Sequence, residues 1–392
     1  MPDIKAIQAE LKAGKIDGWL FYDHHRRDPI AANVLGLGHD GMATRRWFYF
    51  VPAKGEPRKL EHRIERGALD ALAGKRLEYS SWQELHAGLR KLLAGSRTVA
   101  MQYSPENNIP YIGLVDAGTV ELVRKLKKRV VSSADLVQTF EAAWTPEQLK
   151  MHLEAGHAID RIVREAFARA AEAVREGKPM SEYELQQWML EQFRGSGLTT
   201  AEPPVVAVQP NNANPHYEPT AKSSRPIRAG DLLLLDVWAK CDRPGSVYYD
   251  VTWTGYLGER VPEAYAKIFR IVQGARDAAI ECVKTALAKQ RVIHGWEVDR
   301  AAREWIRKAG YAKYFVHRTG HSIGQEVHGN GANMDSLETR DDRKIMPRTC
   351  FSVEPGIYLP EFGIRSEVNV YVGEREAQVT GAVQTEILAL LS

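Results

Sequence analysis

The sequence contains little cysteine and no long apolar run. Its 392 residues include three cysteines, Cys241, Cys282 and Cys350, and none of them belongs to a CxxC pair. This count argues against a disulfide framework and favours reduced thiols. No apolar stretch approaches the ~20 residues that a membrane-spanning helix needs, and residues 1–18 suggest an amphipathic helix rather than a signal peptide. We therefore expect a cytoplasmic protein without a membrane partner.

An excess of charge of one sign is also missing. The formal net charge is +3 at pH 7, from 53 Lys and Arg residues against 50 Asp and Glu residues. The general basic footprint of a nucleic-acid-binding protein is therefore absent, and the basic run at 124–129 is more typical of a solvated face. The apolar fraction of 44% is ordinary for a soluble globular protein, and the length allows two domains.

The chain is expected to form two domains, with a boundary near residue 140: residues 1–140 and residues 141–392. The first domain alternates strand and helix signals, which is an α/β pattern. Strands are predicted at 17–22, 46–51 and 98–102, and helices at 64–73 and 82–93.

The second domain is predicted to repeat the order helix, helix, strand, strand, which places the chain in the α+β class. Thr145, Pro146 and Gln148 provide a cap residue, a proline at the first helical position and a capping-box partner. The helix that they open should end near Arg175. Further helices are predicted at 182–193, 263–289 and 297–309.

Two pairs of carboxylates share one layout within these repeats. Asp236 and Glu354 each end an apolar run, and Asp250 and Glu367 each follow near the start of another strand. An acid at a strand end is commonly a turn residue, and a glutamate there could simply pair with an arginine. Buried acids on neighbouring strands repel, however, unless a cation lies between them.

A histidine-rich segment supplies the fifth candidate ligand, His321. Gly320 and Gly324 beside it permit a close approach of the backbone to a ligand. Four carboxylates and one imidazole suit two hard or borderline divalent ions, with Mn²⁺ the first expectation and Zn²⁺ or Co²⁺ also possible. Four of the chain's 12 histidines fall in or near this region, a clustering that chance could also produce: His216, His317, His321 and His328.

In order and approximate spacing, these five residues resemble the ligands of the pita-bread metallopeptidases: methionine aminopeptidase, Xaa-Pro aminopeptidase and prolidase. Residues 145–385 resemble the catalytic domain, and the preceding α/β region is similar to the creatinase-like N-terminal domain of the proline-specific branch. Residues 214–217 (NPHY) resemble that branch's PHY segment, and residues 317–329 (HRTGHSIGQEVHG) resemble its HGxGHxxGxxxHE block. SVEPGIY and GIRSEV match the blocks that carry the two glutamates.

The resemblance implies a pita-bread fold, a homodimer and small proline-containing peptides as substrates. It also implies two bound metal ions and a bridging hydroxide that attacks the Xaa-Pro bond, with Glu354 as the general base. His216, His317 and His328 would line the pocket. Arg365 would share a strand face with Glu367 and would balance or orient it. The implied metal ligands are Asp236, Asp250, His321, Glu354 and Glu367.

The sequence departs from the family pattern beside the aspartates. Val251 and Trp253 stand where the family has Tyr and Arg, Trp238 replaces a glycine, and Gly329 replaces the glutamate after the last histidine. These changes put substrate preference and metal affinity in doubt. Trp238 and Trp253 could wall a pocket for a proline ring, although core packing is the more ordinary role for both.

We expect an Xaa-Pro dipeptidase, a prolidase; the alternative is an Xaa-Pro aminopeptidase. A dipeptidase must read the substrate's C-terminal carboxylate, and Arg340, Arg343 and Arg365 are the candidate readers. A non-catalytic binding protein of the same fold is less expected because all five ligands are present. Two glycine motifs are weaker still: residues 36–41 fit GxGxxG and residues 320–324 fit GxSxG, but neither precedes a predicted helix.

Overall fold

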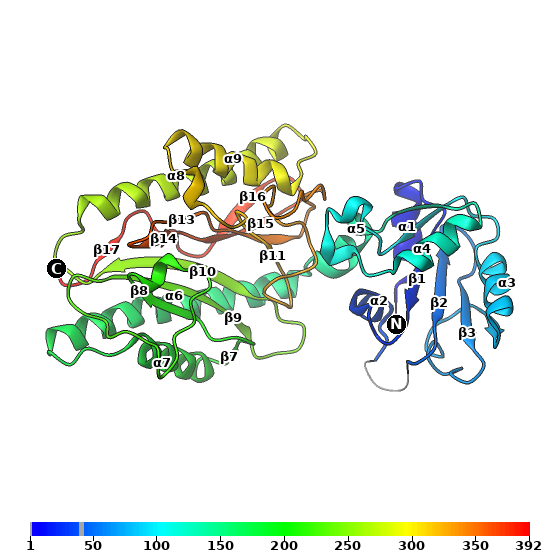
Figure 1. The fold of residues 1–392 in the computed structure, drawn as a ribbon, viewed down its shortest axis with the longest axis horizontal. Helices are drawn as coiled ribbons and strands as arrows, with labels where there is room; N and C mark the ends of the chain where they lie inside the picture. The colour runs from blue at the N-terminus through cyan, green and yellow to red at the C-terminus, as the bar shows by residue number, and fades with distance from the viewer. Residues whose placement is uncertain (1, 39–42) are drawn as a thin grey trace. The chain divides into compact units, whose positions relative to one another are not determined.

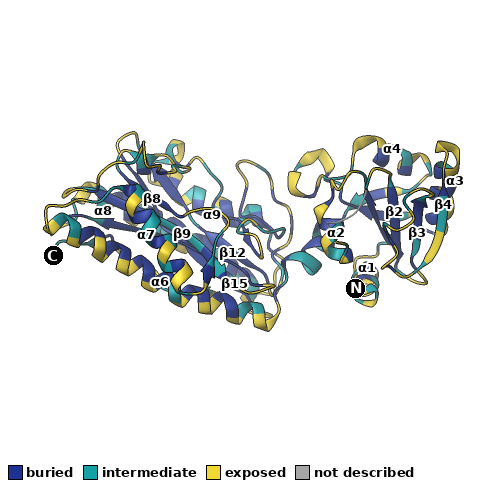
Figure 2. Cartoon of the chain, turned by 90° about the horizontal axis from the view of Figure 1, so that it is seen from below, coloured by how far each residue is buried: buried dark blue, intermediate teal, exposed yellow. Residues whose placement is uncertain are grey.

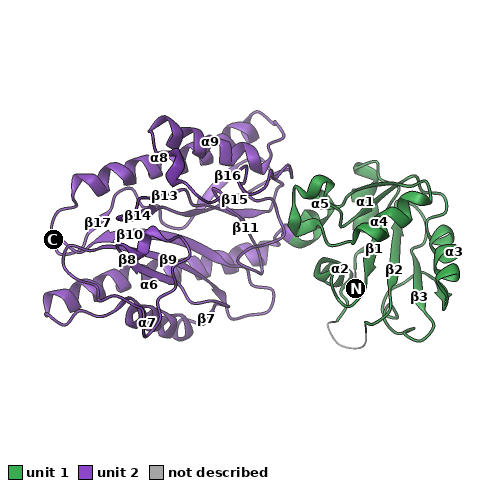
Figure 3. Ribbon diagram, viewed as in Figure 1, with its two compact units in different colours: residues 1–141 green, residues 142–392 purple. Residues whose placement is uncertain are grey.

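The computed structural model describes residues 2–38 and 43–392, which divide into two compact units, 1–141 and 142–392 (Figure 3). Residues 39–41 of the GxGxxG motif lie outside the described residues. The next element along the chain is a strand, which is not the helix that a dinucleotide site needs. Within the described residues, no helix is long and apolar enough to cross a membrane. The three cysteines form no disulfide.

Unit 1 contains a six-stranded sheet in the order β4-β3-β2-β1-β5-β6, in which β2 runs antiparallel to both neighbours and the other pairs are parallel. The strands are β1 (Gly18–Asp23), β2 (Trp47–Pro52), β3 (Arg58–His62), β4 (Lys75–Tyr79), β5 (Thr98–Met101) and β6 (Arg129–Ser132). The α-helices are α1 (Ile4–Ala13), α2 (Pro29–Leu35), α3 (Trp82–Leu92), α4 (Ala117–Lys125) and α5 (Ala134–Val137).

Both faces of this sheet are covered, because successive side chains of a strand point to opposite faces. Trp19 and Phe21 of β1 pack with α1 and α2, whereas Leu20 and Tyr22 pack with α3 and α4. All six residues of β1 are consequently buried.

The helix predicted at 64–73 is wrong: the segment is a series of turns, and the flanking strands β3 and β4 were not predicted. Buried side chains of β3 hold this segment. The Lys59 ammonium donates to the carbonyls of Leu69 and Leu72, each at 2.8 Å, and the Glu61 carboxylate accepts from the Leu69 amide at 3.0 Å. These contacts satisfy backbone groups that a helix would otherwise pair internally.

Unit 2 repeats helix, helix and sheet. Helices α6 (Pro146–Arg175) and α7 (Glu182–Gly195) precede a sheet whose members are β7 (Leu198–Thr199), β8 (Val205–Val208), β9 (Leu232–Cys241), β10 (Tyr249–Tyr256) and β17 (Leu388–Ala389). Helices α8 (Glu263–Ala288) and α9 (Gly295–Lys308) precede a sheet of β11 (Ser322–Ile323), β12 (Cys350–Val353), β15 (Val368–Val372) and β16 (Ala377–Thr380). A two-stranded piece, β13 (Gly356–Tyr358) and β14 (Gly363–Arg365), completes the unit.

The helices lie outside the paired sheets of this unit (Figure 1). Helices α6 and α7 share one apolar core with β9 and β10, and α8 and α9 share another with β12 and β15. Figure 2 shows the outer face of α6 exposed along its length, as expected for an amphipathic helix. The predicted capping box is present, with the Gln148 amide donating to the Thr145 hydroxyl at 3.2 Å.

Candidate metal centre

The first two candidate ligands lie on one face of the β9–β10 pair. Asp236 of β9 is opposite Thr252 of β10, and Asp250 is opposite Trp238. Since side chains alternate along a strand, Leu235 and Val237 point into the core under α6 while Asp236 and Trp238 point to the other side. The strand pattern therefore places both aspartates on the same surface.

The other three candidates come from the second half of the unit. His321 precedes β11, Glu354 follows β12 and Glu367 precedes β15. The Glu354 amide donates to the Thr319 carbonyl at 2.7 Å, and the Glu367 amide donates to the Thr252 carbonyl at 3.3 Å. The second of these bonds joins the two halves beside the site.

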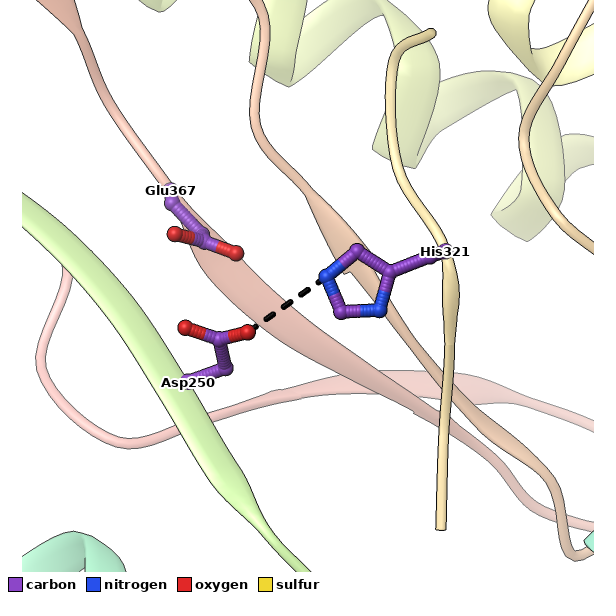
Figure 4. Close-up of side chains that lie close together, drawn as sticks. All are labelled: Asp250, His321 and Glu367. Carbon is purple, nitrogen blue, oxygen red and sulfur yellow. Dashed lines mark ion pairs between the residues drawn. The ribbon is translucent and has the colours of Figure 1, made fainter. Parts of the chain in front are cut away.

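The structure brings all five side chains together. His321 Nε2 lies 3.4 Å from Asp250 Oδ2 and 3.5 Å from Glu354 Oε1. Asp250, His321 and Glu367 each offer one ligand atom, and these atoms lie within 4.8 Å of one another (Figure 4). Asp236 joins them through the Thr252 hydroxyl, which is 3.0 Å from Asp236 Oδ1 and 2.7 Å from Glu367 Oε2.

Two observations show that this donor set fits a divalent cation. His321 Nδ1 is 3.2 Å from the Ser322 carbonyl, so Nδ1 carries the proton and the lone pair of Nε2 faces Asp250 and Glu354. Oδ1 of Asp250 is buried and accepts no hydrogen bond from any described residue. A buried carboxylate oxygen without a partner is costly unless a cation binds it.

The pKa shifts of the candidate ligands also reflect the crowding of buried carboxylates at this site. Burial is the largest cause that raises the pKa of Asp250 and of Glu367 well above the usual range, and the charge of Asp236 adds to both shifts. Burial also raises the pKa of Glu354 and lowers that of His321. A raised carboxyl pKa favours the protonated form of these residues, and a bound metal ion would compete with the protons.

Arg365 pairs directly with Asp236 rather than with Glu367, although its charge also lowers the pKa of Glu367 and so partly balances it, as predicted. Its guanidinium pairs closely with Asp236 Oδ2, donates to the Thr252 hydroxyl at 3.0 Å and lies 4.0 Å from Glu354 Oε2. The predicted shared strand face fails because β14 ends at Arg365 and β15 starts at Val368, with Glu367 between the strands. Arg365 therefore orients the Asp236 carboxylate by pairing with its Oδ2 atom.

The three additional histidines surround this cluster unequally. The His328 ring packs edge-on against His321, with centroids 4.4 Å apart. His317 is half-buried and already bonded at both nitrogens, to the Arg318 carbonyl at 2.7 Å and to the Tyr358 hydroxyl at 2.8 Å. His216 is exposed, and its charge helps to lower the pKa of both other histidines. The sequence therefore placed all three near the ligands, but His317 has no nitrogen left for a ligand.

Asp299 of α9 is a supporting residue that the sequence did not reveal. Its carboxylate is fully buried and accepts from the Thr319 amide (2.9 Å) and hydroxyl (2.7 Å), and from the Ser336 amide (2.9 Å) and hydroxyl (2.6 Å). Arg303 also donates to it at 2.6 Å and binds the His317 carbonyl. This ion pair therefore fixes the loop that carries the histidines.

The contacts of the remaining residues considered in the sequence analysis show where each of them lies. Trp253 belongs to the core beneath α6, whereas Trp238 shares the face of Asp236. Arg343 is buried and bonded to Asp341, and Arg340 stacks on Trp296 with a cation–ring distance of 5.3 Å. The GxSxG serine, Ser322, lies in strand β11 and is not followed by a helix, which excludes the nucleophile elbow.

Comparison with known proteins agrees with this geometry. The model of metallopeptidase family M24 matches residues 154–374, which is more than half of the chain and includes all five candidate ligands. The chain belongs to this family.

Individual proteins also match this chain. A probable dipeptidase PepE of Mycobacterium tuberculosis is 29% identical over 329 residues, 83% of this chain and 80% of that protein. An Xaa-Pro dipeptidase of Lactobacillus helveticus is 31% identical over 224 residues, 57% of this chain and 55% of that protein. The crystal structure of dipeptidase PepE from Mycobacterium ulcerans superposes with a TM-score of 0.68 at 24% identity, covering 99% of this chain and 96% of that one.

These findings confirm the predicted family, the pita-bread fold of the α+β class and a metal-dependent peptidase activity. The chain is thus an M24 metallopeptidase with an additional α/β unit before the matched region.

Proposed function

We propose that the protein is a dipeptidase that uses two divalent metal ions to hydrolyse the Xaa-Pro bond. The observation that carries the proposal is the convergence of Asp236, Asp250, His321, Glu354 and Glu367 from two halves of one unit. Mn²⁺ is the first ion to test, with Zn²⁺ and Co²⁺ next. When bound, the ions would polarise the scissile carbonyl and supply a hydroxide at neutral pH.

The chain's own residues have separate roles in this proposal. Glu354 is the general base, since its carboxylate lies beside the other ligands, with Oε1 3.5 Å from His321 Nε2, where it can take a proton from water and return it to the leaving proline nitrogen. His328 and the exposed His216 donate hydrogen bonds to the oxyanion. His317, bonded to Tyr358, shapes the wall between them. Arg365 and Thr252 hold Asp236 in place.

Arg318 is our candidate for reading the proline carboxylate, and sequence analysis missed it. Its charge lowers the pKa of His321 and of His328, after the larger effect of burial, so it acts directly on the site. A guanidinium beside the histidines would bind a dipeptide's terminal carboxylate and would contribute less to a longer substrate.

The substrate class is tested by comparing Ala-Pro, Ala-Pro-Ala and Ala-Ala as substrates with Mn²⁺ added. The proposal expects the highest kcat/KM for Ala-Pro, and Arg318→Gln should raise its KM while changing hydrolysis of Ala-Pro amide little. Faster cleavage of Ala-Pro-Ala would instead identify an Xaa-Pro aminopeptidase. A Mycoplasma pneumoniae relative, 28% identical over 238 residues, is named a putative Xaa-Pro aminopeptidase. Comparable cleavage of Ala-Ala would indicate a general dipeptidase.

Three further proposals complete the function. The family resemblance supports a homodimer that acts on small proline-containing peptides. The sparse cysteines support a cytoplasmic location, and the change of sequence pattern supports a domain boundary near residue 140. Analytical ultracentrifugation tests the first of these, and limited proteolysis near residue 140 tests the last.

A further inference from the structure

Unit 1 contains a cavity of about 940 Å³ that is unrelated to the metal centre. It lies at the sheet edge where the parallel strands β1, β3 and β4 end, next to the first turns of α3 and α4. In open α/β sheets, ligands bind at the carboxyl ends of parallel strands. The volume is also within the range of small-molecule sites.

Most of the charged side chains that line this cavity are basic. Arg27, Arg45, Arg46 and Lys125 line it, against two acids, Asp116 and Glu121. Asp116 is already used as the cap of α4, accepting from the Thr119 amide and hydroxyl at 2.8 Å each. Across residues 2–38 and 43–392, no ion pair joins any of the four cations to a carboxylate.

A strained turn presents part of this positive charge. After β1 ends, His25 and Arg26 adopt positive φ angles of 63° and 54°, which residues other than glycine rarely adopt. The Asp23 carboxylate holds the turn by accepting from the amides of Arg26 (3.0 Å) and Arg27 (2.7 Å). The turn directs Arg27 into the cavity beside His24, whose pKa is lowered by burial and then by the neighbouring charges.

Aromatic rings form another part of the cavity wall. Trp82, the first residue of α3, is 63% exposed, and its ring meets the His86 ring in a T-shaped arrangement with centroids 5.4 Å apart. Tyr79 ends the adjacent strand β4 and also lines the cavity. An exposed indole in the wall of this basic cavity offers a flat apolar surface on which an aromatic ring can stack.

We propose that this cavity binds a small organic phosphate that carries an aromatic ring. Guanidinium groups match the geometry and double charge of a phosphate monoester, and the indole would stack on the attached ring. The chemistry is shared by mononucleotides and simple aryl phosphates. The proposal stands apart from the peptidase function, because no residue of this cavity takes part in the metal centre.

Isothermal titration calorimetry on the full chain would test the site with four probes: adenosine 5′-monophosphate, phenyl phosphate, inorganic phosphate and adenosine. We expect at least one ring-bearing phosphate to bind with a Kd at or below about 1 mM, more tightly than inorganic phosphate, and adenosine not to bind. Arg46→Gln and the exposed Lys125→Gln should each weaken binding about tenfold, the effect of losing one charge-assisted contact. Trp82→Ala should weaken only the ring-bearing probes.

Arg26→Gln is the matched control, because Arg26 belongs to the same turn but does not line the cavity. Asp250→Asn is the control for phosphate binding at the metal centre. Both variants should bind the probes like the wild type. Failure of both ring-bearing phosphates to bind, binding unaffected by Arg46→Gln and Lys125→Gln, or binding abolished by Asp250→Asn would each overturn the proposal.

Discussion

Replacement of Asp299 by asparagine tests whether the histidine loop depends on a single buried carboxylate. The two oxygens of Asp299 accept five hydrogen bonds, from Thr319, Ser336 and Arg303. Asparagine has nearly the same shape but presents an NH₂ group to the donors on one side. At least two charge-assisted bonds are then lost, and the Arg303 charge is left without its buried partner.

The magnitude follows from these contacts. Each charge-assisted bond is worth about 1.5–3 kcal/mol, and breaking a buried ion pair from one side costs about 3–5 kcal/mol. We expect Asp299→Asn to lower the free energy of unfolding of unit 2 by about 3–5 kcal/mol. Activity should also fall, by about 10–100-fold in kcat/KM, since the Thr319 carbonyl anchors Glu354 and Arg303 holds the His317 carbonyl.

The same helix provides a matched control. Glu304 and Arg307 form an exposed ion pair at 2.7 Å, so Glu304→Gln removes a similar pair where water replaces the lost contact. Urea denaturation should show a shifted transition for unit 2 in Asp299→Asn alone, with the transition of unit 1 as an internal reference. A loss below about 1 kcal/mol would refute our account of this loop.

Three further outcomes are expected. His321→Ala should abolish bound metal in elemental analysis and lower kcat/KM by more than about 100-fold, and bound metal unchanged from the wild type would contradict its role as a ligand. Thr252→Val keeps the side-chain shape but loses its contacts with Asp236, Glu367 and Arg365, so titration should show about 10–100-fold weaker metal binding at nearly unchanged stability. In the metal-free protein, the raised pKa values of Asp250 and Glu367 mean that the folded state binds more protons than the unfolded state. The stability that these two residues contribute is therefore greatest below about pH 4 and is lost as pH rises through their folded pKa values. Thermal unfolding should consequently show that saturating Mn²⁺ stabilises the protein more at pH 8 than at about pH 6.

The sequence predicted elements whose signals are local. The cap and proline at Thr145 and Pro146 predicted the start of α6 correctly, because a capping box depends only on neighbouring residues. The helix expected at 64–73 failed for the opposite reason, since Lys59 and Glu61 of a neighbouring strand hold its backbone. Local propensity gave no sign of those tertiary contacts.

In the candidate site, too, local signals were predicted from the sequence and tertiary contacts were not. The ligands share a recognisable context at strand ends, so their convergence could be expected from sequence. The roles of Thr252 and Arg365 depend on strand register and on the break between β14 and β15, which no spacing rule supplied. Asp299 resembles a solvated helix residue until Arg303 and Thr319 are seen around it.

The division of the metal ligands between two repeated halves has a consequence for folding. Asp236 and Asp250 come from one half and the other three from the second, so neither half alone presents a complete set of donors. Closing contacts this distant in sequence is a late event in folding, because the entropy of the long intervening loop must be overcome first. Bound ions would consequently slow unfolding much more than they accelerate refolding. Removal of the ions would therefore raise the unfolding rate of the protein while its native fold is still retained.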